Sequence, residues 1–485
     1  MRKMIWMVAV AGVLAVAGPA QAQTVANRPQ VAQAIRLLEG WLDGQRSFEQ
    51  VPAVSGAVVL DQEVVWLGSY GLADRERKLP ATPETLYSIC SISKLFTSIG
   101  VMQLRDAGKL RLDDPVNQHL PWFNLKEKSP EWGHITIEGM LTHSSGLPRE
   151  SNQPYWTGPD FPFPTVEAIR DGLPNQETLY PPETYFQYSN LGMALLGEII
   201  AARSGQSYAE YVTSQILRPL GMSSTTPEIP ATEYGKKLAI GYGSLTRGAV
   251  RDRVQLFQAR GIAPAAGYAS NAVDLAKFIS WQFRLLKSGS NHEVLKAPTL
   301  RDMQRVHWTD QDFSTTWGLG FVVFRNDDRT FVGHGGSCPG YRTQVLLEPA
   351  TRIGTVFLAN AMVNSGQYAR NMYSIMAPAL RAVAKDTAAG KPADTTLEPY
   401  AGRYSDQPWG SESLILPWDD GLATVDLPST NPMGSMTKLK KTGEHTFRRI
   451  RSDDTLGETW VFTLGPDGRA TRYTVNGNHS FRITP

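Results

Sequence analysis

A short segment without large apolar side chains divides the chain into two stretches with different patterns. This segment, Asp386 to Thr396, reads DTAAGKPADTT and is typical of a linker. Before it, helical and strand-like patterns are interspersed, whereas after it short strand-like runs follow one another. A length of 485 residues also exceeds what one domain usually takes. We therefore expect a first domain at residues 23–385, a linker at 386–396 and a second domain at 397–485.

The first residues have the pattern of a cleaved export signal. Arg2 and Lys3 precede an apolar run from Met4 to Ala17, and Ala20-Gln21-Ala22 is a small-residue cleavage site. The run is shorter than the roughly 20 residues that a membrane-spanning helix needs. We expect residues 1–22 to be a signal peptide, the mature chain to be periplasmic or secreted, and no stable membrane insertion.

Charge and cysteine content exclude several classes of protein. Lys and Arg total 48 against 46 Asp and Glu, so no basic face for nucleic acid is indicated. Two cysteines exclude a disulfide scaffold and a four-cysteine zinc module. We find no metal-ligand set and expect no cofactor. The oligomeric state stays open.

The first stretch combines amphipathic helices with apolar strands. Val31, Ile35, Leu38 and Leu42 recur at helical spacing and predict a helix near 30–44. Similar patterns predict helices at 91–107, 191–203 and 272–286, a hairpin of 57–60 with 64–67, and strands at 321–324, 344–347 and 355–358. Because the strands come from both ends of this stretch, we expect a sheet assembled from both ends.

The second stretch consists of short strand candidates. They lie at 400–404, 413–416, 422–427, 446–450, 459–464 and 470–475. Pro466-Asp467-Gly468 and Asn476-Gly477 are turn signals between or after them. This spacing predicts a small antiparallel barrel or sandwich.

Ser91-Ile92-Ser93-Lys94 is a candidate nucleophile and base at the start of a predicted helix. Helical residues three apart share a face, so the Ser91 hydroxyl and the Lys94 amine can meet. A serine needs a neighbouring base, and burial or a nearby cation could give the lysine a suitable pKa. Ser435 and Lys438 have the same spacing, but strand geometry does not bring positions three apart together.

Two further segments carry candidate site residues. Tyr188-Ser189-Asn190 stands just before a predicted helix, where Asn190 is either an N-cap or a functional residue. His334-Gly335-Gly336-Ser337 lies beside strand candidates, where the glycines either admit a ligand or make a turn. Taken alone, neither segment decides between its two interpretations.

The order and surroundings of these three elements strongly resemble the serine β-lactamase and penicillin-binding-protein fold family. The segments that carry the resemblance include YSICSISKLF, ITIEGMLTHSSGLP, YFQYSNLGM and GHGGSCPGYRTQ, and they are spread over most of residues 30–385. The class C-like branch, which includes esterases and D-amino-acid peptidases, is the more similar one. Residues 397–485 resemble the lipocalin-like barrels appended to some members. The resemblance implies an α+β fold, with an antiparallel sheet flanked by helices, an all-helical region and a small antiparallel β-barrel.

The resemblance also implies roles for the candidate residues. Ser91 would attack a carbonyl and form an acyl-enzyme, while Lys94 and Tyr188 would move its proton. Tyr188 would then activate the water that hydrolyses the ester. The backbone N–H groups of Ser91 and Ser337 would form the oxyanion hole, and Asn190 would hold the amide carbonyl of the substrate.

The chain departs from the β-lactamase pattern at His334, where those enzymes carry a lysine. A histidine there would supply positive charge only partly at neutral pH. The resemblance associates this exchange with peptidases and esterases more than with dedicated lactamases. Gly336 and Ser337 would lie on the same substrate-binding segment. His143 falls in a motif that is structural in this family, so we expect it to be structural here.

Cys90 and Cys338 flank the implied site. Cys90 precedes Ser91, Cys338 follows Ser337, and the fold would place both segments at the active-site wall. Export permits oxidation, so we hypothesise a disulfide between them. The alternative is two separate buried thiols.

These features predict an exported serine hydrolase of peptides or related amides, including those with D-residues. The appended barrel favours peptides modestly, because such barrels can cover the cleft. Alternatives are a carboxylesterase, a D-alanyl-D-alanine carboxypeptidase, a weak β-lactamase, and a penicillin-binding sensor that is acylated without turnover. An α/β-hydrolase is disfavoured because its elbow would need glycine at position 339, which is Pro339.

Overall fold

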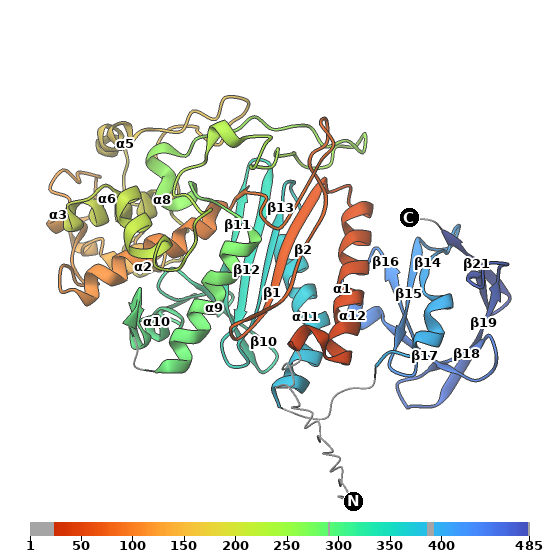
Figure 1. Cartoon of the computed structure of the whole chain (residues 1–485). Helices are drawn as coiled ribbons and strands as arrows, with labels where there is room; N and C mark the ends of the chain where they lie inside the picture. Colours follow the sequence, from red (N-terminus) through yellow and green to blue (C-terminus); the bar gives the residue numbers. More distant parts are fainter. Residues whose placement is uncertain (1–23, 290–291, 386–391, 484–485) are drawn as a thin grey trace, which may run out of the picture.

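The computed structural model describes residues 24–289, 292–385 and 392–483. The predicted signal peptide, residues 1–22, and residues 386–391 of the predicted linker lie outside the described residues. The rest forms an antiparallel sheet between helical layers, with a separate closed barrel at the C-terminal end (Figure 1). This confirms the predicted α+β fold with its antiparallel barrel.

The main sheet is assembled from both ends of the first stretch, as expected. In the described part of the chain it has nine strands, in the order β3-β2-β1-β13-β12-β11-β10-β9-β8. β1 pairs with both β2 and β13 in antiparallel register, which joins the two ends. The strands are β1 (Ala53–Leu60), β2 (Glu63–Asp74), β3 (Leu79–Pro80), β8 (Trp308–Thr309), β9 (Thr316–Trp317), β10 (Val322–Asn326), β11 (Arg329–Cys338), β12 (Tyr341–Glu348) and β13 (Ile353–Ala359). Two short pairs lie outside it, β4 (Tyr87–Ser88) with β5 (Ala269–Ser270) and β6 (His292–Glu293) with β7 (Leu295–Lys296).

Helices cover both faces of this sheet (Figure 1). α9 (Ala272–Ser288) and the helical region with α2 (Ser93–Asp106), α6 (Asn190–Ser204) and α8 (Ala263–Ala266) share one core with one face. α1 (Pro29–Phe48) and α11 (Ser365–Ala384) pack on the other. β1 is buried along its whole length because both of its faces are covered. The remaining helices are α3 (Val116–His119), α4 (Ile137–Leu141), α5 (Val166–Gly172), α7 (Tyr208–Val212) and α10 (Ala297–Met303).

Among the elements absent from the sequence predictions, α11 and β11 are the two that line the cleft. α11 has Pro378 inside it, yet its buried residues recur at helical spacing. β11 contains the glycine-rich segment at 334–337, and glycine is unfavourable in a strand. Its neighbours β10 and β12 nevertheless supply hydrogen bonds on both sides. The interpretation of this segment as a turn is therefore wrong.

The second stretch closes into a barrel rather than a sandwich. Its interior holds aromatic residues, among them Tyr404, Phe447 and Phe462. β17 and β21 were not predicted, because charged and polar residues dominate both segments. The strands are β14 (Gly402–Ser405), β15 (Glu412–Trp418), β16 (Gly421–Leu427), β17 (Thr437–Lys441), β18 (Thr446–Ile450), β19 (Leu456–Leu464), β20 (Ala470–Val475) and β21 (Asn478–Ile483), with the short helix α12 (Pro432–Ser435) between β16 and β17.

Helix α1 joins the two domains, since it lies between the main sheet and the barrel (Figure 1). Leu414 and Leu427 of the barrel lie against Gly40 and Gly44, one helical turn apart on α1. The Trp41 indole N–H also donates to the carbonyl oxygen of Ser429 at 3.0 Å. No helix in the described ranges has both the length and the apolar character that crossing a membrane requires.

Candidate active site

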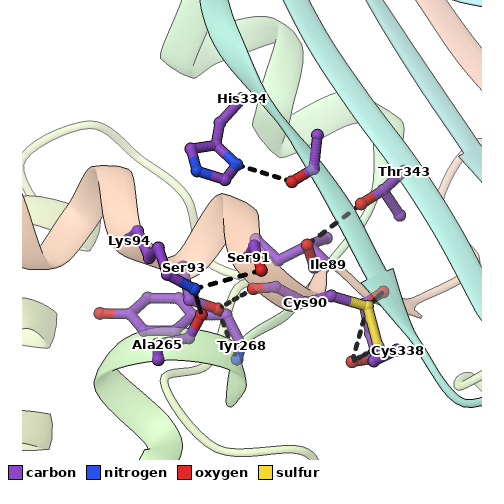
Figure 2. The surroundings of a disulfide bond; sticks show 12 residues. Ile89, Cys90, Ser91, Ser93, Lys94, Ala265, Tyr268, His334, Cys338 and Thr343 are labelled. Atoms are coloured by element: carbon purple, nitrogen blue, oxygen red, sulfur yellow. Dashed lines mark hydrogen bonds between the residues drawn. A yellow bond between two sulfur atoms is a disulfide. The ribbon is translucent and has the colours of Figure 1, made fainter. Parts of the chain in front are cut away.

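The predicted pair of Ser91 and Lys94 meets at the start of α2. Ser91 lies in a single 3-10 turn, Cys90–Ile92, directly before the α-helix. Three residues per turn align a residue with the one three positions on. Lys94 Nζ consequently lies 3.2 Å from Ser91 Oγ (Figure 2). Ser91 is half-buried and lines a cleft.

Lys94 is fully buried among neutral acceptors. Its Nζ donates to Asn190 Oδ1 at 2.7 Å and to the carbonyl oxygen of Ala265 at 2.9 Å. Burial lowers the pKa of Lys94 well below its usual value, while Glu150 raises this pKa and Arg149 lowers it. With Nζ uncharged, its two N–H groups would bond to these two acceptors and leave its lone pair for Ser91 Oγ, the third polar atom within 3.2 Å.

Tyr188 completes the group around the nucleophile. Its hydroxyl hydrogen-bonds to Ser91, and burial raises the pKa of this phenol. Lys94 Nζ lies 4.7 Å and Arg149 Cζ 4.9 Å from the centre of its ring. Tyr188 is therefore a protonated phenol at neutral pH in this arrangement, within reach of the same oxygen as Lys94.

His143 packs behind Tyr188 and is buried. The ring centres of His143 and Tyr188 are 4.3 Å apart, and Trp317 on β9 closes the wall at 5.0 Å from His143. His143 Nδ1 accepts a hydrogen bond from the backbone N–H of Ser189 at 3.2 Å. These contacts fix the segment that carries Tyr188, which agrees with the structural role expected for His143.

Asn190 is not the N-cap of its helix. Ser189 takes that position, because its side chain accepts from the backbone N–H of Gly192. The Asn190 side chain is instead a bridge, with Oδ1 on Lys94 and Nδ2 donating to Glu150 Oε1 at 2.8 Å. The contact of Asn190 with a substrate carbonyl stays a prediction.

Arg149 and Glu150 are site residues that the sequence analysis missed. They directly follow the HSSGLP segment, and the only signal was a charged pair beside a family motif. Their side chains form an ion pair at 3.2 Å, and the Tyr155 hydroxyl donates to Glu150. Both act on Lys94 electrostatically, in opposite directions.

His334 is a neutral histidine. It is buried on β11, and its Nδ1 lies 2.6 Å from the carbonyl oxygen of Gly335, which places the ring proton on Nδ1 (Figure 2). Burial and the nearby Lys94 lower the pKa of His334 to about 3. The expectation that it carries part of a positive charge at neutral pH is therefore wrong.

Gly336 lets β11 approach the nucleophile turn. A Cβ at this position would collide with the carbonyl oxygen of Ile89 and with Thr343 Oγ1, which themselves hydrogen-bond at 3.1 Å. Any side chain would push the turn that carries Ser91 away from the strand. Ser337 follows at the exposed mouth of the cleft.

A disulfide joins Cys90 to Cys338, with their Cα atoms 5.7 Å apart, which confirms the hypothesised bond (Figure 2). It connects the residue before Ser91 to the residue after Ser337. The two backbone N–H groups predicted to bind the oxyanion therefore belong to segments tied to each other covalently.

The residues lie in a cleft of about 760 Å³. Ser91, Tyr188, His334 and Ser337 line it, together with Arg149, Arg342 and residues 363–366 at the start of α11. Within the described ranges none of the lining residues comes from the barrel, so the barrel gives no support to a preference for peptides in the single chain. The described residues contain no group of three His, Cys, Asp or Glu side chains that could hold a metal ion.

Solved structures share this fold. A structure of the octameric penicillin-binding protein homologue from Pyrococcus abyssi has a TM-score of 0.61 and 24% identity, covering 92% of this chain and all of that one (100%). EstCE1, described as a hydrolase with promiscuous acyltransferase activity, has a TM-score of 0.61 and 21% identity, covering 71% of this chain and 98% of that one. At these identities the likeness shows the fold alone.

Sequence relatives match about two thirds of the chain. Protein flp of Staphylococcus aureus (strain MW2) is 29% identical over 317 residues, 64% of this chain and 60% of that protein. Beta-lactamase-like protein 2 of Dictyostelium discoideum is 28% identical over 346 residues, 68% of this chain and 60% of that protein. The chain thus spans less than two thirds of the length of these relatives. A family model described as Beta-lactamase matches residues 38–377. The chain therefore belongs to the beta-lactamase family of hydrolases.

Proposed function

We propose that the protein is an exported serine hydrolase that forms an acyl-enzyme on Ser91 and acts on peptides or related amides, including those with D-residues. The observation that carries the proposal is the environment of Lys94. Burial lowers its pKa, two neutral acceptors can take the N–H groups of an uncharged amine, and the Ser91 hydroxyl is the third polar neighbour of Nζ. A base held in this way is what a serine nucleophile requires.

Acylation uses both proton carriers. The Ser91 proton passes to Lys94 Nζ as Oγ bonds to the carbonyl carbon. When the tetrahedral intermediate collapses, the bond to the leaving nitrogen or oxygen breaks, and that atom takes the proton of the Tyr188 phenol. Positioned proton transfers of this kind contribute about 10²–10⁴-fold in rate. The acyl-enzyme then holds Lys94 as an ammonium and Tyr188 as a phenolate.

Deacylation restores both groups. The Tyr188 phenolate takes a proton from water as the water oxygen bonds to the acyl carbon. The ester bond to Ser91 Oγ then breaks, and Oγ recovers its proton from Lys94. In both steps the N–H groups of Ser91 and Ser337 would bind the oxyanion, each contributing about 3 kcal/mol of transition-state stabilisation.

A carboxylesterase is the second candidate. Lactamases carry a fixed cation at the position of His334, whereas His334 is neutral. The missing charge disfavours rapid lactam hydrolysis. A neutral side chain there also does not require the substrate to be a peptide. EstCE1 shares the fold and is itself described as a hydrolase. The weak lactamase and carboxypeptidase alternatives have less support for the same reason.

The test compares kcat/KM on matched amide and ester pairs built from D- and L-residues. We expect amide turnover, its loss by about 10³-fold or more in Ser91→Ala, and no change in Ser435→Ala, the control with the same Ser-x-x-Lys spacing. Turnover of simple esters alone would overturn the peptidase proposal in favour of the esterase. Labelling of one site per chain without turnover would instead indicate the sensor.

Export is tested separately. In bacterial expression we expect the mature chain to begin at Gln23 and to accumulate outside the cytoplasm. An intact Met1 on the accumulated protein would contradict the signal peptide.

A further inference from the structure

A second pocket lies where the main sheet, α11 and the region of α12 meet, and we call it the interdomain pocket. Its volume is about 420 Å³, which is within the range of pockets that hold small molecules. β10, β11, β12 and α11 of the first domain line it, together with Asn431 and Met433 of the second. Among the described residues, none that lines it also lines the cleft with Ser91. The interdomain pocket is therefore a site of its own, at the kind of domain junction where ligands often bind.

Aromatic and aliphatic side chains form most of the wall of this pocket. The rings of Phe324 and Phe331 stack with their centres 5.4 Å apart, and Tyr373 meets Phe331 edge-on at 5.0 Å. Phe331 and Leu346 lie on the face of the sheet that packs against α11, and Met433 continues the apolar wall from the second domain. The pocket can therefore bury the apolar body of a ligand.

Two arginines of the pocket converge on one buried carboxylate. Arg381 Nη1 donates to the Tyr373 hydroxyl at 3.0 Å, and this hydroxyl donates to Glu348. Arg329 Nε lies 3.9 Å from Glu348 Oε1, which is too far for a hydrogen bond. Glu348 is buried behind Tyr373 and does not line the pocket. Because two guanidinium groups share a single buried carboxylate, one positive charge is left without a buried partner.

The N–H groups of these two arginines are mostly available to a ligand. Within residues 24–289, 292–385 and 392–483, the side chains of Arg329 and Arg381 make one hydrogen bond between them, the bond to Tyr373. Asp327 and Asp328, on the turn between β10 and β11, are exposed, and Asp328 Oδ1 lies 3.8 Å from Arg329 Nε. Water and salt weaken the attraction of such exposed carboxylates. A guanidinium can offer two parallel N–H groups, which match the two oxygens of a carboxylate.

We propose that the interdomain pocket binds a small organic carboxylate, with the carboxylate group between Arg329 and Arg381 and the apolar body against Phe331 and Leu346. A singly charged carboxylate suits this pocket better than a phosphate, because one positive charge is uncompensated and the walls are mostly apolar. The ligand would contact Met433 as well as the first domain, so it would stabilise the two domains in their present arrangement. The site takes no part in the acyl-enzyme chemistry and does not rest on the proposed function.

The experiment measures binding by calorimetry to the full chain with Ser91→Ala, so that the cleft cannot turn a probe over. The probes are benzoate, phenylacetate and octanoate, each compared with its carboxamide. We expect at least one acid to bind at one site per chain, about 10-fold or more tightly than its carboxamide, the range of a charge-assisted hydrogen bond. Arg329→Gln and Arg381→Gln should each weaken the acid by about 10-fold. Asp327→Asn should tighten it severalfold by removing a repelling charge, and asparagine tolerates the positive φ of 53.9° rounded to 54° at this position.

Two control variants locate the bound acid. Arg325→Gln removes an exposed arginine of β10 outside the pocket, and Arg342→Gln removes one that lines the cleft. Neither should change the affinity for the acid. Ser374→Trp, on the α11 side of the pocket, should fill the space and abolish binding. The acid should also raise the unfolding temperature of the Ser91→Ala chain, and the increase should be lost when Arg329→Gln is added.

The comparison of acid with carboxamide can overturn the inference even if a pocket variant fails to fold. Equal affinity for both, or no binding of any of the three acids at millimolar concentration, contradicts it. Binding that is lost in Arg342→Gln but survives in Arg329→Gln also contradicts it, because the acid would then lie in the cleft. None of these results bears on the acyl-enzyme, which is tested by turnover.

Discussion

The proposed mechanism depends on Lys94, whose surroundings favour the uncharged amine that a base requires. Taking an ammonium group out of water is costly unless a carboxylate pairs with it, and the atoms nearest to Nζ belong to an amide, a hydroxyl and a backbone carbonyl. Glu150 lies behind Asn190 and partly offsets this effect, while Arg149 opposes it. Glu150 and Arg149 thus shift the pKa of Lys94 in opposite directions without contacting its amine.

This arrangement predicts shifts of the pH profile in opposite directions. Only the uncharged amine accepts the Ser91 proton, so kcat/KM falls as pH falls through the pKa of Lys94. Glu150→Gln removes a charge that raises this pKa, and we expect the acid limb to move to lower pH by roughly half a unit or more. Arg149→Gln should move the limb to higher pH. The profiles are measured on an uncharged substrate, with Glu444→Gln in the barrel as control.

Shifts of both variants in the same direction would contradict this account. His334→Gln provides a further check, because a residue whose pKa is about 3 does not titrate near neutrality. It should leave the position of the acid limb unchanged, whatever it does to the rate.

At the scale of elements, the site is a contact between one 3-10 turn and the two strands β11 and β12. Gly336 permits the approach, the hydrogen bond from Thr343 to Ile89 spans it, and the disulfide locks it. The bond closes a separation of 248 residues. It restricts the unfolded chain and also holds the two segments that carry the predicted oxyanion donors.

Removing the disulfide should therefore affect both stability and rate. For Cys90→Ala combined with Cys338→Ala we expect the free energy of unfolding to fall by about 2–5 kcal/mol. We also expect kcat on an amide to fall, because the turn and the strand separate more easily. Urea unfolding and steady-state kinetics measure the two effects. Reductant should reproduce them in wild type and change nothing in the double variant, and an unchanged kcat would show that the bond has no positioning role.

Elements with a strong local pattern were predictable. The amphipathic spacing of α1 and α9 and the Ser204-Gly205 end of α6 gave these helices within a few residues, and the apolar runs gave β1, β10, β12 and β13. β11 was missed as a strand because its glycines lower strand propensity, and only its two neighbours in the sheet overcome that. Assigning β11 as a strand requires its hydrogen bonds with β10 and β12, which the sequence of the segment itself does not show.

The site was predictable only in part, for the same reason. Ser91 and Lys94 share one turn, so their spacing sufficed. Asn190 contacts Lys94 across 96 positions. Its bridging role and the partners Arg149 and Glu150 depend on how separate elements pack.

At the scale of the whole molecule, the barrel is attached on the side of α1 (Figure 1), and none of its described residues lines the cleft. Gly40 and Gly44 give α1 a groove that Leu414 and Leu427 fill. Glycine is unfavourable within a helix. At these two positions it lowers the stability of α1 but permits close packing between the domains.

A larger side chain at Gly44, in the groove of α1, should weaken the contact between the two domains. We expect Gly44→Leu to lower the free energy of unfolding by about 1–3 kcal/mol through overpacking against Leu427, although leucine favours the helix. Ser47→Leu on the exposed side of α1 is the matched control and should be close to neutral. Because the barrel does not line the cleft, turnover of a small substrate below the unfolding temperature should persist in Gly44→Leu. Loss of that turnover in a folded variant would show that the barrel acts on the site.

The most direct test of the whole account is to trap the acyl-enzyme. Wild type is mixed with a slowly hydrolysed ester or lactam, quenched in acid within the first turnovers, and digested for mass spectrometry. The account predicts one acyl group per chain, on the peptide that contains Ser91, and no adduct in Ser91→Ala. An acyl group on another side chain, or undiminished hydrolysis by Ser91→Ala, would contradict it.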